Sequence, residues 1–125
     1  MRQYYSSIAA ADLSASSATT ETLSVPFAGR LLIDESYIRV GEAVGAATTA
    51  ATCTVSVGGI AAATLTPDST ALTAIGDTQV FAPVTGGEKY IYFDAGDDIV
   101  MAHTQCTGGT TTGTAYFHLS LEFAH

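Results

Sequence analysis

The sequence predicts an all-β protein, an antiparallel β-sandwich or jelly roll of about eight strands. Large apolar residues stand in short groups that alternate with polar residues, which is typical of half-buried strands. Threonine is abundant, and its branched side chain favours a pleated sheet over a helix. Turn residues separate the groups at regular spacing, and no segment has the periodicity of a long helix. We therefore expect one sandwich domain over residues 19–125, preceded by an extended N-terminal arm over residues 1–18.

The first predicted strand follows the arm. Leu23, Val25 and Phe27 alternate with polar residues and a proline, so one face of this segment is apolar. Pro26 has no N–H to donate to a neighbouring strand, which places this strand end at an edge or a bend of the sheet. The chain then turns at residues 28–29.

Residues 30–40 form the longest predicted strand, with apolar residues on both faces. The polar segment 34–36 interrupts it and predicts a bulge or a short turn. Residues 41–51 are rich in alanine, glycine and threonine, and we expect a loop there. A short helix is the alternative for this segment.

The clearest hairpin signal lies in the middle of the chain. Cys53, Val55 and Val57 alternate with polar residues, and a second run of mostly apolar residues covers 60–65. Gly58-Gly59 joins the two runs, and glycine suits the favoured two-residue turns because their backbone requires positive φ.

The C-terminal half predicts further strands. Residues 80–82 and 90–93 are separated by a turn at Gly86-Gly87, and residues 99–103 follow a tight turn at 95–97. A glycine- and threonine-rich tip then leads into the last strand, which has the most regular pattern of all. Its alternate side chains divide into a core-facing row and an outward row. The core-facing row is Ala115, Phe117, Leu119, Leu121 and Phe123, and the outward row is Tyr116, His118, Ser120 and Glu122.

Composition argues against several classes of partner. The net charge is −8, and the four basic residues, Arg2, Arg30, Arg39 and Lys89, cannot form a basic patch for nucleic acid or for an anionic membrane. No stretch reaches the roughly 20 apolar residues of a membrane helix. Asp12 interrupts the N-terminal alanine patch, so an ordered arm is expected there rather than a signal peptide. Only 13% of residues are charged, which suits close packing against neighbours.

No enzyme motif is present, and we expect no catalytic residue and no cofactor. The P-loop, the dinucleotide fingerprint, G-x-S-x-G and H-E-x-x-H are all missing. Asp34 and Glu35 are adjacent strand residues that face opposite sides of a sheet, which disfavours them as an acid–base pair. His103 and His118 could meet across a sheet as metal ligands, but we favour two polar strand side chains.

Two further clusters allow more than one interpretation. Asp94, Asp97 and Asp98 could supply oxygen ligands to calcium, but aspartate is also an ordinary turn residue, and we favour the turn. Cys53 and Cys106 are either buried free thiols or a disulfide. Two lone thiols do not make a zinc site, and free thiols would fit assembly in a reducing cytoplasm.

Tyrosines provide the remaining candidate for function. Tyr90 and Tyr92 share one face by the two-residue period of a strand, and Tyr37 and Tyr116 lie in other predicted strands. Exposed tyrosines are enriched at protein interfaces and also form platforms for sugars. We favour an interface and keep the sugar platform as the alternative.

The order of several motifs points to a known family. The segments are 25–29, the long strand 31–41, the hairpin 54–59 and 93–97 before a strand, followed by the glycine/threonine tip. Together they cover about residues 20–124, and their order resembles that of bacteriophage capsid decoration (cement) proteins with a jelly-roll fold.

This resemblance implies a structural virion protein that is assembled in the host cytoplasm and lies on the capsid surface. Such a protein is a homotrimer that binds the major capsid protein and stabilises the shell, and no catalytic or ligand residue is carried over. We expect the N-terminal arm to contact the capsid through Tyr4, Tyr5 and Ile8, and we also expect Tyr90 and Tyr92 to contact a partner.

Two other functions stay open. One is a tail-fibre module that binds a receptor or carbohydrate, for which Tyr90 and Tyr92 would form the platform. The other is a secreted β-sandwich, which would require a cleaved N-terminus and a disulfide between Cys53 and Cys106.

Overall fold

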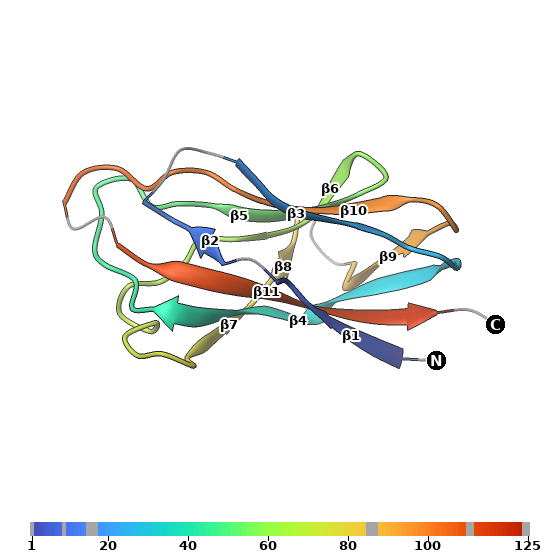
Figure 1. Ribbon diagram of the computed structural model, residues 1–125, viewed down its shortest axis with the longest axis horizontal. Helices are drawn as coiled ribbons and strands as arrows, with labels where there is room; N and C mark the ends of the chain where they lie inside the picture. The colour runs from blue at the N-terminus through green and yellow to red at the C-terminus, as the bar shows by residue number, and fades with distance from the viewer. Residues whose placement is uncertain (1, 9, 15–17, 85–87, 110–111, 124–125) are drawn as a thin grey trace.

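The computed structural model describes residues 2–8, 10–14, 18–84, 88–109 and 112–123. Within these residues there is no helix, and so none that could span a membrane, and eleven strands form two antiparallel sheets (Figure 1). The β-sandwich predicted from the sequence is confirmed. The strands are β1 (Arg2–Ser6), β2 (Ala11–Asp12), β3 (Ala18–Ser24), β4 (Gly29–Glu42), β5 (Cys53–Val57), β6 (Ile60–Leu65), β7 (Thr78–Val80), β8 (Ala82–Pro83), β9 (Tyr90–Phe93), β10 (Asp98–His103) and β11 (Thr114–Phe123).

Strands that are far apart in the sequence pair with one another in both sheets. The larger sheet has the order β1-β11-β4-β7, with β2 also paired to β11 and β9 also paired to β4. The smaller sheet has the order β3-β10-β5-β6-β8. Figure 1 shows the first strand in blue beside the last in red, and β3 lies next to β10 in the other sheet.

The core lies between the two sheets. The inward row of β11 is buried from Ala115 to Leu121, Phe123 at its end is partly buried, and Phe117 at its centre has no exposed surface. Its ring stacks on that of Phe81, with 5.8 Å between centroids. Val55 of β5 and Met101 of β10 are fully buried in the smaller sheet. Each such side chain contributes about 1.5–3 kcal/mol by leaving water, so this interior determines which faces of the sheets remain outside.

β4 changes its inward face at a bulge. Leu31 and Ile33 pack in the core before the bulge, and Ile38 and Val40 do so after it. A regular strand would turn the second pair outward, because side chains alternate. The bulge that segment 34–36 predicts is therefore confirmed, and it keeps both halves of a 14-residue strand on one core.

Ser36 holds this bulge together. The register of β4 against β11 passes from Leu32 opposite Ser120 to Tyr37 opposite His118, so four residues of β4 stand against one of β11. The fully buried Ser36 Oγ donates to the Leu32 carbonyl at 2.8 Å and accepts from the Ser120 N–H at 3.0 Å. These bonds satisfy backbone groups that the interrupted ladder would otherwise leave unpaired.

The middle of the chain follows the prediction with one difference. Gly58 and Gly59 turn the β5–β6 hairpin with φ of 57° and 84°, and residues 43–52 form a loop without helix. The predicted strand 80–82, in contrast, is divided. Val80 belongs to the larger sheet and Ala82 to the smaller, because the chain crosses between the sheets at the buried Phe81. The predicted turn at residues 86–87 lies outside the described part of the chain.

The N-terminal segment is where the structure departs most from the prediction. β1 pairs with β11 over five residues, so residues 2–6 are an edge strand of the domain and not an arm outside it. β2 also pairs with β11, and Leu13 is buried in the core. Sequence reasoning missed β1 because its inward side chains, Gln3 and Tyr5, do not form an apolar alternation.

Candidate binding surface

Tyrosines and arginines gather on the outward face of the larger sheet. Five of the chain's six tyrosines and three of its four basic residues point outward there, on strands whose alternate residues form the core. We call this surface the tyrosine–arginine face. It comprises Arg2, Tyr4, Arg30, Tyr37, Arg39, Tyr90, Tyr92, Tyr116, His118 and Glu122.

His118 contacts Tyr37 and Arg39 of this face and also Ser6 of β1. The Tyr37 ring stacks on it with 4.9 Å between centroids and 8° between planes. Arg39 Nε donates to His118 Nε2 at 3.4 Å, and Ser6 Oγ is 2.8 Å from His118 Nδ1. The Arg39 guanidinium also lies 5.5 Å from the Tyr116 ring centroid. Because Nε2 accepts a hydrogen bond, we assign the ring proton to Nδ1. Partial burial and the charge of Arg39 lower the pKa of His118, so the ring is neutral at pH 7.

The other two arginines of the face are neutralised by glutamates. Arg2 Nη1 lies 2.9 Å from Glu35 Oε1. Arg30 contacts Glu122 Oε1 through both Nε and Nη2, each at 2.8 Å. Exposed pairs of this kind contribute at most about 1 kcal/mol to stability, but they hold the long arginine side chains in place. The face is therefore ordered and nearly uncharged, unlike a surface that binds nucleic acid.

Tyr90 and Tyr92 share this face as predicted, but they do not form a flat platform. Their rings meet edge to face, with 5.3 Å between centroids and 76° between planes. The Arg30 guanidinium lies 4.9 Å from the Tyr90 centroid, whereas 68% of Tyr92 is exposed. One ring, Tyr92, is thus available for stacking. It borders a shallow groove of about 460 Å³, whose other lining residues are Ala28, Gly29, Arg30, Phe93, Asp94, Glu122 and Phe123.

The predicted N-terminal contacts divide between surface and interior. Tyr4 is 65% exposed and lies on the tyrosine–arginine face, and Ile8 is 88% exposed. Tyr5 instead packs inward against the core, and its hydroxyl donates to Glu21. The alternation of β1 explains this difference, because neighbouring residues of a strand face opposite sides.

The two predicted histidines do not come together. His103 is buried on the inward side of β10 in the smaller sheet, with Nδ1 3.1 Å from Thr20 Oγ1. His118 points outward from the larger sheet. Asp34 and Glu35 are both exposed in the β4 bulge.

The aspartates around Gly96 form the predicted tight turn. Asp97 Oδ2 accepts the Asp94 N–H at 2.8 Å, and Asp98 Oδ1 accepts the Ser24 hydroxyl at 3.0 Å. Two of the three carboxylates are therefore occupied by the chain itself. Across residues 2–8, 10–14, 18–84, 88–109 and 112–123, no group of three or more His, Cys, Asp or Glu side chains could hold a metal ion.

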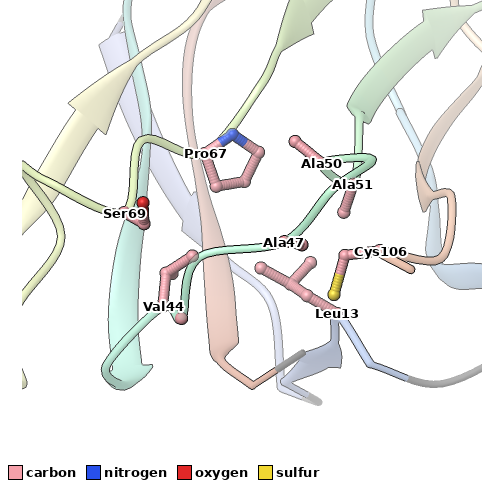
Figure 2. Close-up of a pocket in the computed structure, with 9 residues that line it drawn as sticks. Leu13, Val44, Ala47, Ala50, Ala51, Pro67, Ser69 and Cys106 are labelled. Atoms are coloured by element: carbon pink, nitrogen blue, oxygen red, sulfur yellow. The ribbon is translucent and has the colours of Figure 1, made fainter. Parts of the chain in front are cut away.

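Both cysteines are buried free thiols. Burial raises the pKa of Cys53 to about 12, so its thiol is protonated and unreactive. Cys106 borders a small cavity of about 70 Å³ beneath the loops at the other end of the sandwich, where its N–H bonds the Leu13 carbonyl (Figure 2). This cavity is small and is lined mainly by alanine and other apolar side chains.

The outward face of the smaller sheet is chemically different. Its strands carry no tyrosine, phenylalanine or arginine over their described residues, and their outward residues are mostly threonine, serine and alanine. Thr22, Thr54 and Ser56 are examples. The sandwich thus has one face rich in aromatic and guanidinium groups and one face of small side chains.

No protein-family model, no curated protein and no solved structure matches this chain.

Proposed function

We propose that this chain is a structural virion protein, a decoration (cement) protein that binds the outside of a capsid shell through its tyrosine–arginine face. The observation that carries the proposal is the gathering of five tyrosines and three arginines on one outward face. Tyrosine and arginine dominate binding energy at protein interfaces because they combine large contact area with hydrogen bonding. A face with this composition is typical of a protein-binding surface.

The side chains of this face are held in fixed positions, which favours tight binding. Stacking on His118 and the Arg30–Glu122 pair hold its long side chains before a partner arrives. Binding then loses less side-chain entropy, which would otherwise cost about 0.5–1.5 kcal/mol for each immobilised residue. A protein that stabilises a shell needs no catalysis, because a ligand that binds only the assembled state stabilises that state by mass action.

The proposed partner is the major capsid protein, and we propose that the chain acts as a homotrimer on the virion surface after assembly in the host cytoplasm. The free thiols of Cys53 and Cys106 agree with a reducing compartment. Tyr4 and Ile8 are exposed and are the N-terminal side chains available to such a partner. A trimer has three times the chain mass of 12.8 kDa, which light scattering on the purified protein measures.

Cosedimentation with capsids tests the proposal. Shells assembled from the major capsid protein of the same genome, and lacking this chain, are mixed with wild-type protein, with Tyr4→Ala/Arg39→Ala, and with the control Thr22→Ala/Thr54→Ala on the other sheet. We expect the wild type and the control to bind, and the first variant to bind at least tenfold more weakly, as expected when interface anchors are lost. Shells that never take up the wild type, or that bind both variants equally, would refute the proposal.

A carbohydrate-binding module of a tail fibre is the second candidate. One observation favours it, the exposed Tyr92 ring beside a groove that contains a charged pair. That groove lies at one end of the tyrosine–arginine face, so both functions can coexist in one molecule.

A further inference from the structure

We infer that the groove between Tyr92 and Glu122 is a binding site for a neutral saccharide. The groove is lined by residues at the end of the larger sheet where β4 begins and where β9 and β11 end. Figure 1 shows these strand ends close together. This inference does not rest on capsid binding.

The polar side of the groove offers an acceptor and a donor next to each other. Glu122 Oε1 is contacted by both Nε and Nη2 of Arg30. Among the described residues, Glu122 Oε2 and Arg30 Nη1 have no hydrogen-bond partner. Two neighbouring hydroxyls of a sugar match this arrangement, because one can donate to Oε2 while the other accepts from Nη1.

The apolar side of the groove offers a ring for stacking. Tyr92 is 68% exposed, and its edge-to-face contact with Tyr90, which the Arg30 guanidinium covers, sets its orientation. Phe123 lines the groove and packs edge to face against Phe93 at 5.8 Å. A sugar ring has an apolar face of C–H groups and a rim of hydroxyls, so it can stack on Tyr92 while its rim reaches the charged pair.

Gly29 shapes the groove. A Cβ at this position would lie 2.3 Å from the Glu122 carbonyl oxygen, so β4 and β11 approach closely only because residue 29 has no side chain. This approach places Arg30 and Glu122 side by side in the sheet, where they are cross-strand partners.

The charges around the groove select the class of ligand. The groove is lined by Asp94, Glu122 and one cation, Arg30, which is already paired with Glu122. The lining is therefore net negative, and the chain carries a net charge of −8, which disfavours phosphates and carboxylates. A neutral hydroxylated ligand with an apolar face meets no such cost. The volume of about 460 Å³ falls within the range of small-molecule sites, but the groove is shallow, and we expect a dissociation constant near 1 mM for a single sugar ring.

The test is an NMR titration of the full ¹⁵N-labelled chain with glucose, galactose, mannose and N-acetylglucosamine, beside sialic acid and inorganic phosphate as anionic probes. We expect at least one neutral sugar to shift the amide signals of Arg30, Tyr92 and Phe123. Tyr92→Phe should retain this binding, because the stacking ring remains. Tyr92→Ala and Glu122→Gln should each weaken it at least fivefold, and the control Thr54→Ala, on the outward side of the smaller sheet, should leave it unchanged.

Three results would overturn the inference: no neutral sugar shifts these signals, the anionic probes bind there instead, or Tyr92→Ala binds as well as the wild type. None of these results involves capsids, so the sugar site and capsid binding can fail separately. Tyr92 is mostly exposed, so its variants keep the buried core intact, and an unchanged amide spectrum in the absence of sugar verifies this.

Discussion

Replacing Ser36 with alanine should destabilise the fold far more than the loss of one small side chain would indicate. The Ser36 hydroxyl is buried at the β4 bulge, where it donates to the Leu32 carbonyl and accepts from the Ser120 N–H. Alanine leaves both backbone groups in the interior without this partner. The cost of a buried unsatisfied group is about 1–3 kcal/mol, so we expect Ser36→Ala to lower the free energy of unfolding by about 2–4 kcal/mol.

Urea unfolding followed by circular dichroism measures this loss. At roughly 4 °C per kcal/mol for a domain of this size, the melting temperature should fall by about 8–16 °C. Ser56→Ala provides the matched control, since Ser56 lies on the outward side of β5 and its replacement should change stability by less than about 0.5 kcal/mol. If both variants unfold alike, the bulge does not depend on Ser36 and our account of β4 is wrong.

Three further predictions concern single groups. Because the pKa of His118 is lowered in the folded chain, its contribution to stability is present at neutral pH and is lost as the pH falls below about 6.5. Urea unfolding at pH 7.5 and 5.5 should therefore show a smaller change in the free energy of unfolding for His118→Gln than for the wild type. Equal changes in the two proteins would contradict this. The Cys53 thiol, with its pKa raised to about 12, should resist iodoacetamide at pH 8 in the native protein and react after unfolding, so a native mass shift at Cys53 would be inconsistent with the structure. Gly29→Ala should cost about 1–3 kcal/mol because its Cβ would clash with the Glu122 carbonyl, and a variant as stable as the wild type would show that β4 and β11 separate freely.

The sequence predicted those parts of the fold that depend on local patterns. The alternation around Phe117 identified the inward row of β11, and Gly58-Gly59 located a hairpin, because both signals lie within one short segment. The polar segment 34–36 located the bulge for the same reason. The sequence pattern did not predict β1, because an edge strand with polar side chains on both faces has the same pattern as an irregular segment.

The tyrosine–arginine face could not be predicted, because it depends on strand order. Arg39 and Tyr116 are neighbours across β4 and β11, and Arg30 stands beside Tyr92 across β4 and β9. The two-residue period of a strand indicates which of its residues share a face. It does not indicate which strands are adjacent or which sheet they join. Tyr90 and Tyr92 were therefore recognised as a pair, while their relation to Arg30 required the structure.

Oxidative footprinting of the chain, free and bound to capsids and followed by mass spectrometry, locates the binding surface directly. We expect Tyr4, Tyr37 and Tyr116 to lose reactivity on binding, while Val100, on the outward side of the smaller sheet, keeps the reactivity that it has in the free protein. Protection of the smaller sheet with unchanged tyrosines, or no change at any residue, would contradict the claim that the tyrosine–arginine face is the binding surface.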